Sequence, residues 1–151
     1  MNNGPLRAFL LASIILLVSG CGGEGLERVR LSVDGERIAF SRVAGSISAL
    51  ESGGYIVTLA APGDEFFLSW RAESPNPSAW IGERCRVERI HVDTESAEIS
   101  GKLPGVGIIV EVTDATAKTV SGRFSGSVGV GAGSHDIDDG TFCVSLIYRK
   151  I

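Results

Sequence analysis

The densest group of potential metal ligands in this chain of 151 residues lies near its C-terminus. His135, Asp136, Asp138 and Asp139 place one imidazole and three carboxylates in a single short segment. Oxygen-rich loops bind Ca²⁺, but an EF-hand loop needs the pattern Asp-x-Asp-x-Asp-Gly and a distal glutamate, and this segment has neither that spacing nor the glutamate. We therefore expect a polar turn that leads into the last strand, with weak cation binding as the alternative. We assign no metal ion and no cofactor.

The other histidine, His91, lies among charged residues in segment 84–93, which favours an exposed side chain on a strand. The acidic residues of segment 83–98 are interspersed with arginines, as on a solvated surface, and the chain contains no Gly-x-Ser-x-Gly nucleophile turn. We therefore expect no enzymatic activity. An enzyme would require His91 or His135 beside a serine or a carboxylate in a cleft.

The irregular segment 73–84 (ESPNPSAWIGER) is the best candidate for a recognition loop. Its two prolines, Pro75 and Pro77, favour an extended backbone. Trp80 and Arg84 are residue types that are common in binding hot spots. The alternative, which we favour for Trp80, is an indole that packs inward and holds the loop against the edge of the domain.

The elements that must position these residues are β-strands, because apolar and polar residues alternate with period two in segment after segment. Asp34-Gly35 and Pro62-Gly63-Asp64 indicate two hairpin turns, and Pro104-Gly105 predicts a third hairpin, between segments 97–103 and 106–112. The sequence thus predicts an all-β domain. We favour an antiparallel β-sandwich, with a small calycin-like barrel as the alternative. The expected core includes Phe40, Phe66, Trp70, Phe124 and Phe142.

The composition bounds the function as well as the fold. With 44% apolar residues and 21% charged residues, the chain is suited to one compact domain. Its net charge of −4 provides no basic surface for DNA or RNA, so we expect no nucleic-acid partner.

The first 20 residues have the layout of an export signal. Arg7 precedes an apolar run at residues 8–18 (AFLLASIILLV), and small residues then lead to Cys21. As a helix this run would be about 16 Å long, which is short of a hydrocarbon core of roughly 30 Å. We therefore expect residues 1–20 to be a cleaved signal peptide, residues 21–26 a short glycine-rich tether, and residues 27–151 a single all-β domain.

The segment Leu17-Val18-Ser19-Gly20-Cys21 resembles the lipobox of bacterial lipoproteins. The resemblance implies cleavage before Cys21, a thioether from its thiol to diacylglycerol, and acylation of the new amine, for example by palmitate. Two or three acyl chains anchor a protein stably in a membrane. Because Gly22, and not aspartate, follows the cysteine, the resemblance also implies the outer membrane, with the domain facing the periplasm.

With Cys21 lipidated, Cys85 and Cys143 remain as an even pair in an oxidising compartment. A disulfide is the default in such a compartment, and in the chain-entropy model it would add about 4 kcal/mol of stability. We therefore expect a disulfide between Cys85 and Cys143, with two unpaired thiols as the alternative.

A second resemblance covers the mature part of the chain. The segments 33–36 (VDGE), 121–126 (SGRFSG) and 139–142 (DGTF) are similar to small β-sandwich lipoproteins of unknown function. This resemblance implies the fold and no catalytic residues. We expect a membrane-anchored envelope lipoprotein that acts as a non-catalytic binding or structural module with an envelope protein as partner. The alternative is a β-barrel lipoprotein that binds a small ligand or a cation.

Overall fold

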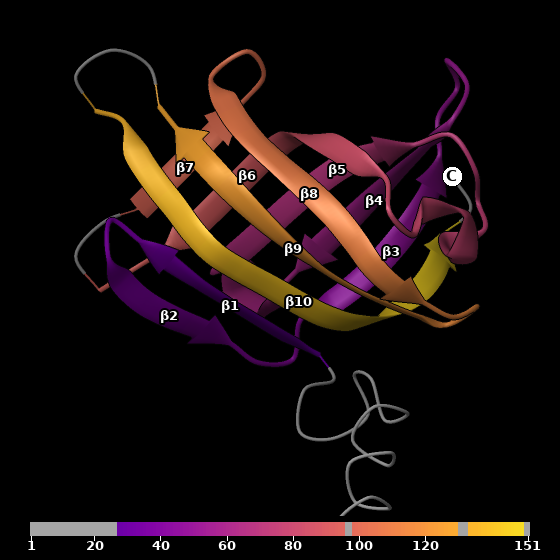
Figure 1. The fold of residues 1–151 in the computed structure, drawn as a ribbon, viewed down its shortest axis with the longest axis horizontal. Helices are drawn as coiled ribbons and strands as arrows, with labels where there is room; N and C mark the ends of the chain where they lie inside the picture. The colour runs from indigo at the N-terminus through magenta and orange to yellow at the C-terminus, as the bar shows by residue number, and fades with distance from the viewer. Residues whose placement is uncertain (1–26, 96–97, 130–132, 150–151) are drawn as a thin grey trace, which may run out of the picture.

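The computed structural model describes residues 27–95, 98–129 and 133–149, and these residues form an all-β domain (Figure 1). The predicted fold class is therefore confirmed. The expected signal peptide, the lipidated Cys21 and the tether up to residue 26 lie outside the described residues. Within the described part of the chain, no helix is both long enough and apolar enough to span a membrane.

The described residues form ten strands and two short 3₁₀ turns. The strands are β1 (Arg28–Val33), β2 (Glu36–Phe40), β3 (Ala44–Ala49), β4 (Tyr55–Ala60), β5 (Phe66–Ala72), β6 (Arg84–Asp93), β7 (Glu98–Lys102), β8 (Val106–Ala115), β9 (Thr119–Val128) and β10 (His135–Arg149). The turns are η1 (Pro62–Asp64) before β5 and η2 (Pro77–Trp80) before β6.

Two of the three predicted hairpins are confirmed, and the third is wrong. β1 pairs with β2 across Asp34 and Gly35, which both have positive φ angles, and β4 pairs with β5 across η1. However, β7 pairs with β6 and not with β8. Pro104-Gly105 marks a chain reversal but does not select a partner. Because β6 is ten residues long, it pairs with β8 near its start and with β7 near its end.

Seven strands close into a barrel, in the order β10, β3, β4, β5, β6, β8, β9 and back to β10 (Figure 1). The closing strand is β10, whose 15 residues pair with β9 along one edge and with β1 and then β3 along the other. Its pairing with β3 is parallel, whereas every other strand pair among the described residues is antiparallel. The architecture therefore corresponds to the barrel alternative. Alternation could not distinguish it from a sandwich, because closure depends on how one long strand bends.

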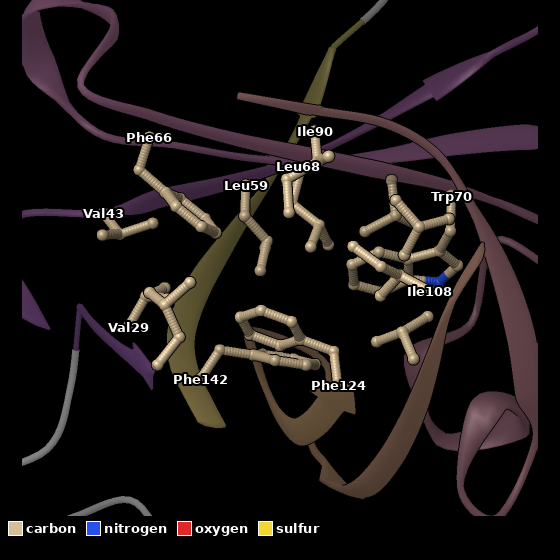
Figure 2. Packing of buried hydrophobic residues seen from close by; sticks show 14 of the residues in the cluster. Val29, Val43, Leu59, Phe66, Leu68, Trp70, Ile90, Ile108, Phe124 and Phe142 are labelled. Carbon is tan, nitrogen blue, oxygen red and sulfur yellow. The ribbon is translucent and has the colours of Figure 1, made fainter. Parts of the chain in front are cut away.

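The interior of the barrel is a packed apolar core (Figure 2). The phenylalanine rings form a chain of contacts, with centroids 5.3 Å apart for Phe40 and Phe66 and 6.3 Å apart for Phe66 and Phe124. Phe142 continues the chain, 6.3 Å from Phe124 and 5.7 Å from Trp70. All five side chains are buried, so the predicted core is confirmed. These aromatic rings therefore fill the part of the interior that they line.

Glycines on the inner face of β10 and β9 make room for these rings. A Cβ atom on Gly140 would lie 2.7 Å from ring carbons of Phe124, and one on Gly122 would lie 2.6 Å from the ring of Phe142. Real Cβ atoms do not approach other heavy atoms so closely. The strand register pairs each glycine with the phenylalanine that it accommodates.

Candidate functional site

The hairpin of β6 and β7 places four polar side chains together on the outer wall. In β6, Ile90 and Val92 point into the core, so the alternating residues His91 and Asp93 point outward. In β7, which has Ile99 as its buried residue, the outward residues are Glu98 and Ser100. The register pairs His91 with Ser100 and Asp93 with Glu98, and directly opposed residues on one face lie within contact distance.

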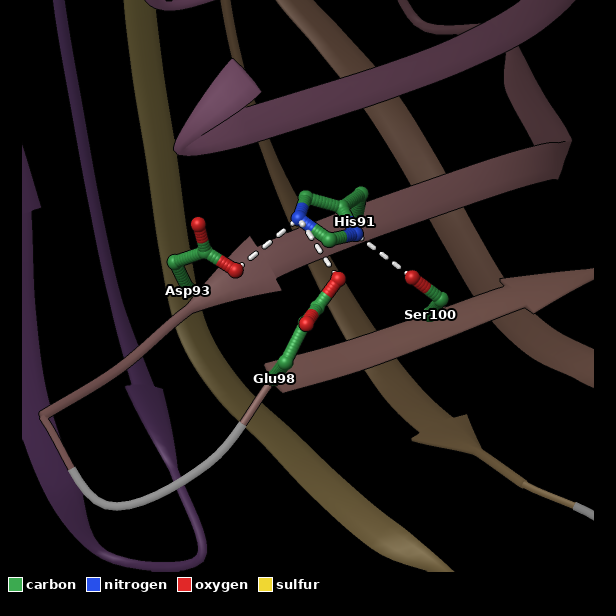
Figure 3. Close-up of polar contacts among 4 residues, drawn as sticks. All are labelled: His91, Asp93, Glu98 and Ser100. Carbon is green, nitrogen blue, oxygen red and sulfur yellow. Dashed lines mark hydrogen bonds and ion pairs between the residues drawn. The ribbon is translucent and has the colours of Figure 1, made fainter. Parts of the chain in front are cut away.

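Both ring nitrogens of His91 have polar partners (Figure 3). Nε2 lies 2.9 Å from Oδ1 of Asp93 and 3.8 Å from Oε1 of Glu98. Nδ1 lies 2.5 Å from Oγ of Ser100. The exposed fraction of the side chain is 21% for His91, 43% for Asp93 and 74% for Glu98. The imidazole is thus held in one orientation while its side chain remains partly exposed to solvent.

The backbone also holds this cluster in place. The N–H of Asp93 donates a hydrogen bond to the carbonyl oxygen of Glu65, at 2.8 Å, in addition to the pairing of β6 with β7. His91 lies opposite Phe67 of β5 on its other side. A site built on paired strands keeps its geometry better than a site built on a loop.

The contacts of the cluster require a hydrogen-bond donor or a cation at Nε2. A bare imidazole lone pair would face two carboxylates, and that contact is repulsive. A proton on Nε2 converts the contact into a hydrogen bond, and a metal ion between the three groups would also satisfy it. The potential ligand atoms of His91, Asp93 and Glu98 all lie within 4.8 Å of one another, and no other such group of three occurs in the described residues.

A groove of about 760 Å³ surrounds the cluster and opens to solvent. The acidic cluster lies in it together with Asp64, and two cationic side chains, Arg89 and Lys102, also line it. Arg89 lies opposite Lys102 in the strand register, and its guanidinium carbon is 5.5 Å from the centroid of the Phe67 ring. The groove therefore presents both signs of charge beside one aromatic face.

The acidic segment that the sequence singled out forms a different structure. Nδ1 of His135 lies 2.7 Å from Oδ2 of Asp34, and the N–H of Asp136 donates to Oδ1 of Asp34, at 2.8 Å. These contacts, the histidine first, lower the pKa of Asp34 below its ordinary value. Asp138 and Asp139 lie where the pairing register of β10 shifts, and they do not join His135 in a group of metal ligands. The segment connects the β1–β2 turn to the start of β10.

Trp80 is buried, so the idea that it is displayed for recognition is wrong and the inward-packed alternative is correct. Its exposed fraction is 1%, and its indole N–H donates to the carbonyl oxygen of Ser74, at 2.8 Å. The turn η2, capped by the side chain of Asn76, directs the indole inward. Arg84 remains exposed, with Nε 3.9 Å from Oε2 of Glu111.

The predicted disulfide between Cys85 and Cys143 is also wrong, because Cys85 is a free thiol. Strands β8 and β9 lie between the strands that carry the two residues, and disulfide-bonded Cα atoms must lie within about 7 Å of each other. Burial, and to a lesser extent the negative charge of Glu83, raises the pKa of Cys85. The remaining predicted cysteine site, Cys21, lies outside the described residues.

Sequence reasoning took His91 for an exposed strand residue and missed the cluster around it. The sequence did contain a signal. His91 and Asp93 are two residues apart and therefore lie on the same face of a strand, and the same holds for Glu98 and Ser100 after a short turn. To predict the cluster from this signal, one must also know that β6 pairs with β7. No protein-family model matches the chain, and no curated protein matches it. The site must therefore be interpreted from its own geometry.

Proposed function

We propose that this protein is a lipid-anchored module of the bacterial cell envelope that binds its partner on the outer wall of the barrel and performs no catalysis. The anchor is Cys21, which follows the lipobox-like residues 17–20. The first strand begins at Arg28. A fully extended chain of residues 22–27 spans at most about 20 Å, so the barrel would stay close to the membrane surface.

The filled interior supports a binding surface on the outside. The aromatic chain from Phe40 to Phe142 occupies the space that an internal ligand would need. A groove of about 760 Å³ instead lies over β5, β6 and β7, where charged side chains are held by strand pairing. This groove is the observation that carries the assignment of a binding role, and an envelope protein or a small charged ligand are the partners it suits.

A Ser–His–Asp hydrolase is the competing interpretation, because Ser100, His91 and Asp93 form a continuous polar chain. Two features favour binding. Glu98 adds a second carboxylate at Nε2, which a triad does not need and a bound cation does. Ser100 also lies within the regular strand β7, whereas nucleophilic serines are presented on sharp turns beside free backbone N–H groups.

The anchor is tested by fractionating cells that express the full chain or its Cys21→Ser variant. We expect the wild-type protein in the membrane fraction, with a diacylated N-terminal cysteine by mass spectrometry, and the variant released from the membrane. Cys85→Ser is the matched control and should stay membrane-bound. A membrane-bound Cys21→Ser protein, or an unmodified residue 21, would contradict the proposal.

The non-catalytic assignment is tested by a covalent probe of nucleophilic serines. Labelling of Ser100 by a fluorophosphonate probe would separately overturn the non-catalytic assignment.

A further inference from the structure

We propose that His91, Asp93 and Glu98 bind a divalent transition-metal ion of the zinc type on the outer wall of the barrel. This site goes beyond the proposed membrane anchor and does not depend on it. Its three ligand atoms are Nε2 of His91 and one carboxylate oxygen each from Asp93 and Glu98. They come from two paired strands and lie within 4.8 Å of one another (Figure 3).

The distances suit a metal ion in size. Zinc binds imidazole nitrogen and carboxylate oxygen at about 2.0–2.2 Å, so two ligands at a tetrahedral angle lie roughly 3.4 Å apart. The separations from Nε2 are 2.9 Å to Asp93 and 3.8 Å to Glu98, on either side of that value. Small rotations of two exposed carboxylates would complete the geometry, and the strands themselves need not move.

The second nitrogen of the ring is arranged as in metal sites. A metal-bound histidine usually donates its other ring N–H to a nearby acceptor, which fixes the tautomer and the orientation of the ring. Oγ of Ser100 lies beside Nδ1 and can accept that hydrogen bond. Ser100 is therefore a positioning residue, which leaves the Nε2 lone pair directed at the space between the two carboxylates.

The ligand set selects the class of ion. One imidazole with two carboxylates suits Zn²⁺ and its neighbours, whereas Ca²⁺ requires six to eight oxygen ligands and Mg²⁺ retains most of its waters. The remaining coordination positions would face the groove, which Arg89 and Lys102 also line. Those positions are open to water or to a small anion, so the site would be a binding site with exchangeable ligands.

The test is calorimetric titration of the purified full-length protein with ZnCl₂, using a matched pair of histidine variants. His91→Gln removes the central ligand, whereas His135→Gln removes a histidine that also contacts one carboxylate, at Asp34. Both variants keep all three cysteines, so any zinc bound by thiols is common to them. We expect one zinc ion per wild-type chain, at least about a tenfold loss of affinity in His91→Gln, and no change in His135→Gln.

Two further measurements separate this result from misfolding and from other ligands. Zn²⁺ should raise the melting temperature of the wild type and of His135→Gln but not of His91→Gln, and Ca²⁺ should raise none of them. Co²⁺ in place of zinc should give visible bands without the near-ultraviolet band of a thiolate ligand. Equal zinc affinity in the two variants, or no saturable binding, would overturn the site. His91→Gln should remain in the membrane fraction, so failure here is distinct from failure of the anchor.

Discussion

The two histidines of this protein lie in regions that look alike in composition and differ in structure. His135 is surrounded by acidic residues in the sequence, yet it contacts one carboxylate, that of Asp34, and links a turn to β10. His91 has arginines as well as acidic residues as neighbours along the chain, yet Nε2 faces the carboxylates of Asp93 and Glu98. Local density of ligand types is therefore a poor guide to a site, because side chains on successive residues of a strand point to opposite faces.

The difference follows from strand pairing. At the hairpin of β6 and β7, outward residues of two strands lie opposite each other, so two pairs of polar residues form one cluster. At the start of β10, the register shifts between Ile137 and Gly140, and the carboxylates of Asp138 and Asp139 have no partner strand that brings a second ligand. Strand pairing thus brings the polar side chains of β6 and β7 together, whereas those at the start of β10 lie apart.

The largest expected effect is on stability, in the region of β10. Gly140→Ala would put a Cβ atom 2.5 Å from the carbonyl oxygen of Phe124, and we expect it to lower the free energy of unfolding by about 1–3 kcal/mol. Gly133→Ala is the control, because its Cβ atom would meet nothing within 4 Å. Ser100→Ala in the other region should change stability by less than about 0.5 kcal/mol. Urea denaturation measures all three, and a larger loss in Ser100→Ala would contradict the contrast between the regions.

A smaller effect, on zinc affinity, is expected when His91 is left with one carboxylate contact, as His135 has. Glu98→Gln leaves one carboxylate at Nε2, and we expect zinc affinity to fall at most about tenfold, since Glu98 is the more exposed and more distant ligand. Glu95→Gln, on the same hairpin and outside the cluster, should leave the affinity unchanged. Titration with ZnCl₂ compares the two variants, and equal losses would mean that zinc responds to the general charge of the hairpin.

The smallest effect is a pH dependence at the other histidine. Because the folded-state pKa of Asp34 is lowered, its carboxylate stabilises the fold above the unfolded pKa of about 3.9, and this contribution is lost as pH falls through the folded-state pKa. Asp34→Asn retains a residue that tolerates the positive φ of this turn. We expect the variant to be less stable than the wild type at pH 7 and equal to it at strongly acidic pH, by urea denaturation. Asp136→Asn should match the wild type at both, and a difference for Asp34→Asn that persists in acid would exclude this linkage.

The alternation of residue types was sufficient to predict the all-β class, two hairpins and the aromatic core. Phe66 and Phe142 are buried because inward positions recur every second residue, and that period is a local property of a strand. The pairing of β7 and the unpaired state of Cys85 were less accessible. Each of them depends on segments that are distant in the sequence, and a turn signal does not specify which strand receives the returning chain.

The sequence by itself determined the strands, the residues that face inward and the lipobox-like segment before Cys21, because these depend on neighbouring residue types. The tertiary structure decided that the sheet closes through β10 and that His91 meets two carboxylates. The physical reason is register, since a shift of one residue between β6 and β7 would turn Glu98 and Ser100 into the core and remove the cluster.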